Sequence, residues 1–164
     1  MDRDKLHSLS RSVSLLCQAL DSYERAGLWD MKNELPLQVL FQYELANFAF
    51  YLAAVDNVIR DEEVGTFSQV LGLSLSHQEI LDAIEKNKLS DEKFTNHVPQ
   101  IFVELKRIAD FQKAEGEYDG CLEIFLQVFE AVGMATLESD GEVTEEEKEK
   151  MRAYLNMLGE YIAQ

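Results

Sequence analysis

Residues 140–147 read DGEVTEEE, and residues 56–63, at an offset of 84 positions, read DNVIRDEE. Both stretches begin with an aspartate, carry an apolar residue three positions later and end with a glutamate seven positions after the aspartate. Each follows an apolar segment of helical period and precedes another. The hydrophobic residues after the two turns, in residues 67–71 and 151–155, match at the same offset. The sequence therefore predicts two helix–turn–helix units that are related as an internal repeat.

The rest of the chain also has the pattern of α-helices. Hydrophobic residues recur at steps of three and four along most segments, and no alternating stretch is long enough to indicate a sheet. Pro36 suits the first turn of a helix, because its missing N–H would have no intrahelical partner there. From Leu45 onward this helix is apolar nearly all round, so we expect it at the centre of the fold. Ser76 and Glu79 predict a capping box for a later helix, and Pro99 predicts a helix break.

We therefore expect an all-α fold that consists of a single domain over residues 1–164. No linker rich in proline, serine or glycine divides the chain. The expected architecture is a compact bundle of about seven or eight helices with an internal pseudo-twofold repeat. Its halves would span approximately residues 36–87 and 118–164, and residues 45–71 should superpose on residues 129–155.

The composition argues against several classes of function. The net charge is −16, with 31 acidic and 15 basic residues, whereas nucleic-acid binding depends on lysine and arginine. The longest nearly apolar stretch, residues 45–55, is shorter than the roughly 20 residues that a membrane-spanning helix needs. No apolar run follows Met1, so we expect no secretory signal and a cytoplasmic location. Cys17 and Cys121 lie among apolar neighbours and are expected to be packed thiols.

Helix capping is one explanation for the acids of the two turns. Gly141 permits the positive φ of a sharp turn, and Thr144 with Glu147 predicts a capping box. Glutamates in the first turn of a helix are also stabilised by the helix dipole. In the first copy Asn57 replaces the glycine and Arg60 replaces the threonine. We therefore expect no capping box at the first turn.

A bound divalent cation is the other explanation. Ca²⁺ and Mg²⁺ are bound by carboxylate and carbonyl oxygens, and an aspartate with a glutamate seven positions later supplies part of such a set. The candidate metal ligands are Asp56, Glu63, Asp140 and Glu147. A full EF-hand is excluded, because Thr136 would occupy the first loop position in place of an aspartate. The sequence leaves capping and cation binding open.

The two turns resemble those of a known protein family. Residues 55–57 read VDN and are followed by Glu63, and residues 139–141 read SDG and are followed by Glu147. In an internally duplicated helical domain of this size, these residues resemble the TerB-like family associated with tellurite resistance. The resemblance covers most of the chain, from residue 45 to residue 158.

The resemblance implies a compact pseudo-twofold bundle of about seven helices with an acidic surface proposed to bind metal. The resemblance does not imply a catalytic activity, because none is established for the family. It also implies a role in bacterial stress-response or phage-defence assemblies, beside ATPase or membrane-associated partners. The chain departs from the family pattern at Asn57, where glycine is expected, and at Val55, where a small residue is usual.

The remaining motifs favour binding over catalysis. His7, His77 and His97 lack the spacing of metal ligands, and neither a nucleophile elbow nor a phosphate-binding glycine loop is present. The expected function is a non-enzymatic interaction or regulatory module, with Ca²⁺ or Mg²⁺ as a ligand if the turns hold a cation. The alternatives are a metal-dependent hydrolase that uses the turn carboxylates and an acidic protein that mimics DNA.

An acidic stretch indicates what kind of partner to expect. Residues 138–150 contain seven acids and two lysines. Such a surface accelerates the encounter with a basic surface. The expected partner is therefore a protein with a face rich in lysine and arginine, and the family resemblance adds an ATPase or a membrane-associated complex. Glu142, Glu146 and Glu149 should face solvent.

Overall fold

The computed structural model describes residues 3–28, 35–56, 58–139 and 141–164, with Asp56 described by its backbone alone. In these ranges the chain forms eight α-helices, one 3-10 turn and no strand. The elements are α1 (Arg3–Arg25), α2 (Leu37–Ala53), η1 (Ala54–Asp56), α3 (Asp61–Leu71), α4 (His77–Lys86), α5 (Asp91–Asn96), α6 (Gln100–Glu115), α7 (Cys121–Leu137) and α8 (Glu145–Ile162). The all-α class and the number of helices expected from the sequence are confirmed.

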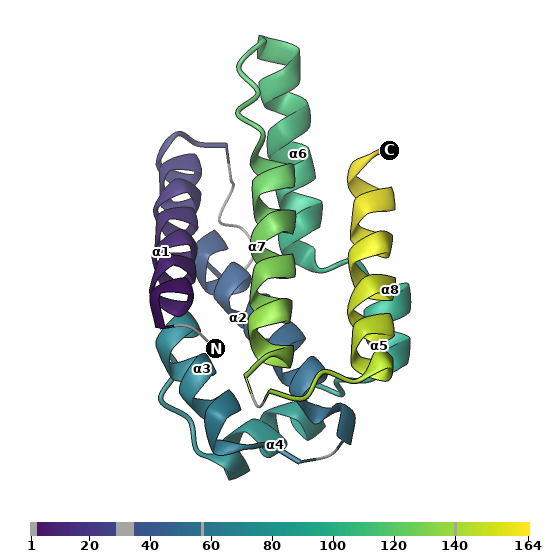
Figure 1. Cartoon of the computed structure of the whole chain (residues 1–164). Coiled ribbons are helices and arrows are strands. Elements are labelled where there is room, and N and C mark those ends of the chain that lie inside the picture. The colour runs from purple at the N-terminus through teal and green to yellow at the C-terminus, as the bar shows by residue number, and fades with distance from the viewer. Residues whose placement is uncertain (1–2, 29–34, 57, 140) are drawn as a thin grey trace.

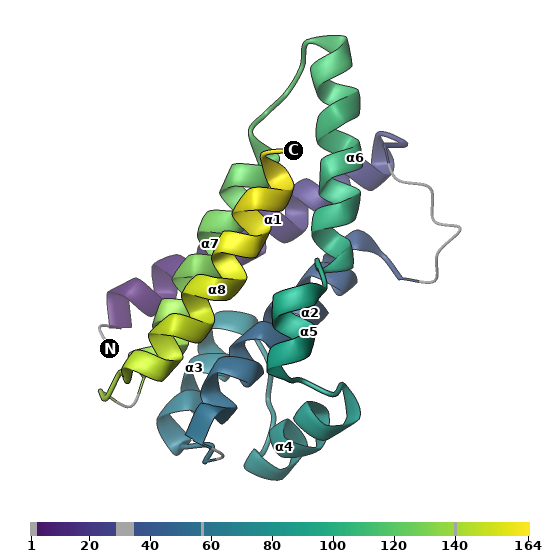
Figure 2. The same ribbon diagram turned by 90° about the vertical axis from the view of Figure 1, so that its right-hand side faces the viewer.

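The helices pack around α2 and α7. Across one face of the molecule α1, α7 and α8 lie side by side, with α7 in the middle (Figure 1). Behind them α2 contacts α1, α6, α7 and α8. At one end α6 extends beyond its neighbours, whereas α3 and α4 close the other end. Figure 2 looks onto the side of the molecule where α5 lies below α6 and beside α8.

The central position of α2 follows from its sequence. Every residue from Leu45 to Ala53 is buried, as the all-round apolar pattern predicts. Phe48 packs against Phe129 of α7 with ring centroids 5.8 Å apart, and against Tyr154 of α8 with ring centroids 4.6 Å apart. Burying one such side chain contributes roughly 1.5–3 kcal/mol. These aromatic contacts therefore hold the three helices together.

Gly133 allows α7 to lie close to both α2 and α8. A Cβ atom at this position would lie 2.9 Å from Sδ of Met151 and 3.1 Å from the ring of Phe48. A carbon–sulfur distance of 2.9 Å is well inside the range at which non-bonded atoms repel one another. A larger residue at position 133 would therefore push the helices apart.

The capping signals of the sequence are confirmed. Oγ of Ser76 accepts the N–H of Glu79 at 3.3 Å, and Oε2 of Glu79 accepts the N–H of Ser76 at 2.8 Å. Gly72 follows α3 in the left-handed conformation, with a φ of 67°. Pro99 separates α5 from α6 and occupies the N-cap position of α6.

The helix–turn–helix order recurs in both halves of the chain. It is formed once by α2, η1 and α3 and once by α7, the following turn and α8. The second helix of the pair has 11 residues in the first half and 18 residues in the second half. The twofold relation between the halves stays a prediction.

Two further expectations concern the cysteines and the membrane. Cys17 and Cys121 are free thiols, of which Cys121 is buried and Cys17 is half-buried. Burial raises the pKa of both thiols, to about 12 for Cys121. Among the described residues, no helix combines the length and the apolar character needed to cross a membrane.

Candidate functional site

The second acidic turn is built as a helix cap. Gly141 has a φ of 86°, in the left-handed region that favours glycine. The N–H of Glu147 donates to Oγ1 of Thr144 at 3.2 Å. Oε2 of Glu147 accepts the N–H of Thr144 at 2.7 Å and its hydroxyl at 2.9 Å. The predicted capping box of α8 is confirmed, whereas Asp140, the other candidate ligand of this turn, lies outside the described residues.

The first acidic turn contains half of the same cap. Oε2 of Glu63 accepts the N–H of Arg60 at 2.7 Å, and Glu63 is only 5% exposed. We expected no capping box at this turn, and that prediction is wrong for one of the two hydrogen bonds of a capping box. The hydrogen bond accepted by the glutamate is present, because it needs only a backbone N–H and no threonine hydroxyl. Asp56 ends the 3-10 turn, but its side chain and Asn57 lie outside the described part of the chain.

The side chains described at the turns do not by themselves form a metal site. Within the described ranges, no group of three or more histidine, cysteine, aspartate or glutamate residues is arranged to hold a metal ion. Glu63 and Glu147 each use a carboxylate oxygen to accept a backbone N–H, as the capping explanation requires. Because Asp140 and the side chain of Asp56 are not described, a cation at either turn stays a prediction.

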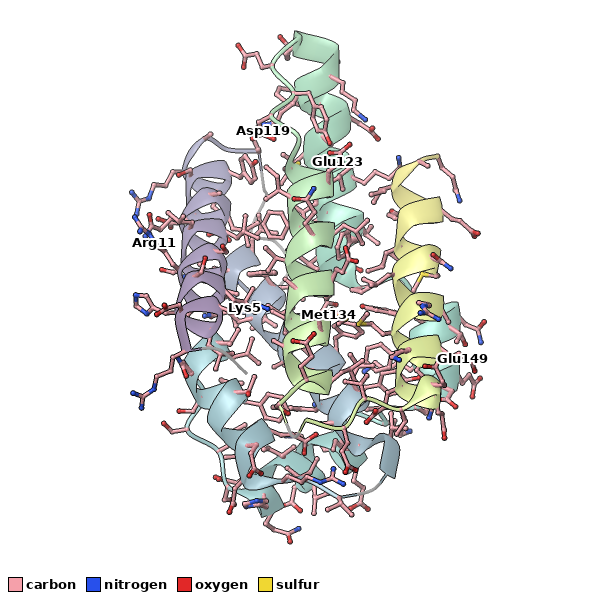
Figure 3. The ribbon with its side chains drawn as sticks, viewed as in Figure 1. Lys5, Arg11, Asp119, Glu123, Met134 and Glu149 are labelled. Atoms are coloured by element: carbon pink, nitrogen blue, oxygen red, sulfur yellow. The ribbon has the colours of Figure 1, made fainter. Side chains whose placement is uncertain are left out.

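Exposed and half-buried acids surround the start of α8. We call this surface the acidic patch, and it consists of Glu138, Glu142, Glu145, Glu146 and Glu149. Glu142, Glu146 and Glu149 are exposed, which confirms their predicted orientation toward solvent. Glu149 lies on the outer side of α8, near the start of the helix (Figure 3).

The two lysines of this stretch are already paired within it. Nζ of Lys148 lies 2.6 Å from Oε1 of Glu145. Nζ of Lys150 lies 3.3 Å from Oε1 of Glu146 and 3.4 Å from Oδ1 of Asp91, on α5. The acids outnumber these two cations, so the patch keeps a net negative charge.

A groove between α7 and α8 adjoins the acidic patch. Its volume is about 510 Å³, and its apolar lining consists of Leu126, Met134, Met151 and Leu155. Lys148, whose ammonium group pairs inside the acidic patch, also lines the groove. Methionine side chains are flexible and adapt to partners of different shape. The molecule therefore presents an apolar contact surface directly beside a charged one.

The start of α6 is capped by a residue of another helix. Pro99 occupies the N-cap position and provides no side-chain hydrogen bond. Instead, Oε1 of Glu44, on α2, accepts the N–H of Gln100 at 2.7 Å, and Oε2 accepts the N–H of Ile101 at 2.8 Å. Burial raises the pKa of Glu44 to about 7, although the two N–H donors and the charge of Lys93 lower it.

The start of α2 follows the same design. Pro36 occupies its N-cap position without a side-chain hydrogen bond, and the N–H of Leu37 donates to Oε1 of Glu24, on α1. Sequence patterns did not reveal either glutamate, because both caps come from a different helix. The feature of the sequence that indicates such a cap is the proline itself. A proline N-cap leaves the first helical N–H groups without a local acceptor, so an acceptor from another helix is needed.

Comparisons of the chain with protein-family models, with curated proteins and with solved structures gave no match. The resemblance to the TerB-like family therefore rests on the residues of the two turns. Of those residues, Asn57 and Asp140 lie outside the described part of the chain.

Proposed function

We propose that this chain is a non-enzymatic interaction module that docks a basic protein surface on its acidic patch. The observation that carries the proposal is the exposure of Glu142, Glu146 and Glu149 around the start of a helix whose opposite face is buried. Like charges that are close together repel one another and so destabilise the compact state. These three acids also lie outside the hydrophobic core, so they do not stabilise the fold by packing. We therefore infer that they serve binding.

The acidic patch and the groove would contribute different parts of the interaction. Exposed acids steer a basic partner toward its binding orientation and raise the association rate, and salt screens this effect. The apolar lining of the groove, including Met134 and Met151, would stabilise the complex after the encounter by burying apolar surface of the partner. We therefore expect a partner that combines lysine or arginine with apolar side chains.

The cation and the cellular role belong to the same proposal. A Ca²⁺ or Mg²⁺ ion at a turn would order the acids of that turn and change the charge that a partner meets. The resemblance to the TerB-like family supports a cytoplasmic role in a bacterial stress-response or defence assembly, with an ATPase or a membrane-associated complex as the partner.

Capture from native cells with tagged protein, followed by measurement of association rates, tests the proposal. The test variant replaces Glu142, Glu146 and Glu149 with glutamine. The control variant replaces Glu115, Glu117 and Glu160, which are also exposed, and changes the net charge by the same amount. A captured partner should associate more slowly with the test variant than with the control, and added salt should remove the difference.

Two results would contradict the proposal. Equal association rates for the two variants would show that total charge matters and that the position of the acidic patch does not. A partner that binds the test variant as fast as the unchanged protein at every salt concentration would place the docking surface elsewhere.

A further inference from the structure

A cavity lies where α2, α5, α8 and the start of α6 meet. Figure 2 shows how the ribbons of these helices are arranged. The volume of the cavity is about 220 Å³, which suits a small organic molecule rather than a segment of protein. Phe94, Val98 and Pro99 form its apolar wall. Phe94 is held in place by Tyr51, whose ring stacks on it at a centroid distance of 4.2 Å.

Tyr154 supplies a hydroxyl group to this cavity. Its side chain lines the cavity and is only 1% exposed, because its ring packs against Phe48 and Phe94. No hydrogen bond from this hydroxyl to any described residue is found. Because this hydroxyl borders the cavity, it can donate a hydrogen bond to a molecule bound there.

Two more donors reach the same cavity. Nζ of Lys93 donates to the carbonyl oxygen of Asn87 at 2.9 Å, and an ammonium group has two further protons to donate. Lys93 forms no ion pair with a carboxylate in the described part of the chain. Oδ1 of Asn47 accepts Nδ2 of Asn87 at 3.0 Å, whereas Nδ2 of Asn47 has no acceptor among the described residues. Asn47 is only 5% exposed.

Among the described residues, Glu44 is the only carboxylate that lines the cavity. Both carboxylate oxygens of Glu44 accept backbone N–H groups at the start of α6. Three hydrogen-bond donors thus line the cavity, on Tyr154, Asn47 and Lys93, and one of them is a cation. A ligand that satisfies them must offer acceptor oxygens, and a carboxylate is the simplest group with two of them.

We propose that this cavity binds a small organic carboxylate with one aromatic ring or a short aliphatic chain. The carboxylate accepts hydrogen bonds from Tyr154, Asn47 and Lys93. The apolar body of the ligand packs against Phe94, Val98 and Pro99. This binding site is independent of the acidic patch and of the cation predicted at the turns.

The titratable groups that line the cavity make binding depend on pH. They are Tyr43 and Glu44 from α2, Lys93 and His97 from α5 and the residue after it, and Tyr154 from α8. An anionic ligand disfavours the ionised form of Glu44, whose pKa is raised by burial to about 7. Binding of a carboxylate should therefore take up protons and strengthen as the pH falls from about 8 to about 6.

Benzoate, benzamide and benzylamine provide a matched test, because they share one ring and differ in the charge of the head group. Titration calorimetry and ligand-observed NMR with the full chain should show binding of benzoate, weaker binding of benzamide and no binding of benzylamine. Tyr154→Phe should weaken benzoate binding about tenfold, as expected for the loss of one hydrogen bond to an anion. Tyr161→Phe, on the same helix but outside the cavity lining, should bind benzoate unchanged.

A second variant keeps the proposal testable if Tyr154→Phe does not fold. If Tyr154→Phe does not fold, Lys93→Met removes the cation at a partly exposed position and should also weaken benzoate binding. Benzylamine binding as tightly as benzoate would overturn the carboxylate assignment. An absence of benzoate binding at millimolar concentration, or equal weakening by Tyr154→Phe and Tyr161→Phe, would overturn the site itself.

Discussion

Glu44 and Gln100 are 56 positions apart in the chain, and a carboxylate oxygen of Glu44 accepts the N–H of Gln100 at 2.7 Å. The second oxygen accepts the N–H of Ile101. A residue in the middle of the central helix thus caps the start of α6. This contact joins α2 to α6 by hydrogen bonds in addition to the packing of the two helices.

Removing this cap should destabilise the fold. Glu44→Ala leaves two N–H groups at the start of α6 without an acceptor, and we expect the free energy of unfolding to fall by about 1–3 kcal/mol. Glu44→Gln retains one acceptor oxygen and should cost less. Denaturant unfolding followed by circular dichroism measures both, with the exposed Glu92→Ala as a control. Equal stability of Glu44→Ala and the control would show that the cap does not stabilise α6.

The stability of the protein should depend on the protonation of Glu44. Its pKa is raised from 4.5 to about 7, primarily by burial. Folding therefore favours the protonated form, so the contribution of this group is complete below its ordinary pKa and is lost as the pH rises through 7. We expect the free energy of unfolding to decrease over this window by about 1.4 kcal/mol per unit of pKa difference.

Glu44→Gln provides the control for this pH dependence, because glutamine does not titrate. Unfolding of both proteins at several pH values should show a decrease that is larger in the unchanged protein. NMR titration of the Glu44 carboxyl carbon measures the pKa directly. An ordinary pKa for this carboxyl would contradict the expectation.

Gly133→Ala should destabilise the contact between α7, α2 and α8. The added methyl group would lie 2.9 Å from Sδ of Met151 and 3.1 Å from the ring of Phe48, and overpacking of this kind costs about 1–3 kcal/mol. Gly159→Ala is the matched control, because it lies in α8 and a Cβ there meets no atom within 4 Å. The control should raise helix stability by roughly 0.5–1 kcal/mol. Thermal unfolding compares the two, and equal melting temperatures would mean that α7 shifts at no cost.

Cation binding at the second turn should be of moderate affinity at best. Asp140 and Glu147 supply too few oxygens for Ca²⁺ or Mg²⁺ without carbonyl groups and water. We expect calorimetry to show heat of binding at millimolar Ca²⁺ or Mg²⁺ and the melting temperature to rise. Asp140→Asn should weaken both effects, whereas Asp82→Asn, on the exposed face of α4, should not. If neither ion produces heat or a shift in melting temperature, only the capping explanation remains.

Local signals in the sequence predicted the helices well, because their causes lie within a few residues. Ser76 and Thr144 begin helices as expected, and their partners are three positions away. The pattern does not predict the half-cap at Glu63, because position 60 lacks a threonine, although the glutamate needs only a backbone N–H.

Contacts between distant segments could not be read from the pattern. Residues 151–155 match the apolar residues that follow the first turn, and Tyr154 among them is buried, but this pattern does not indicate that Tyr154 lines a cavity. Glu44 looks like one charged residue on an apolar helix. Its role depends on the position of Pro99 in space, which follows from the packing of α2 against α6.

The burial of the second half of α2 on every side also determines when the fold can be completed during synthesis. Residues from Leu45 to Ala53 leave the ribosome well before α7, which covers them in the folded protein. Until α7 and α8 have emerged, the nascent chain carries a helix that has apolar groups facing in all directions. Such a segment is prone to aggregation and is a natural substrate for chaperones. The arrangement that gives the mature protein its core therefore exposes the unfinished chain to aggregation.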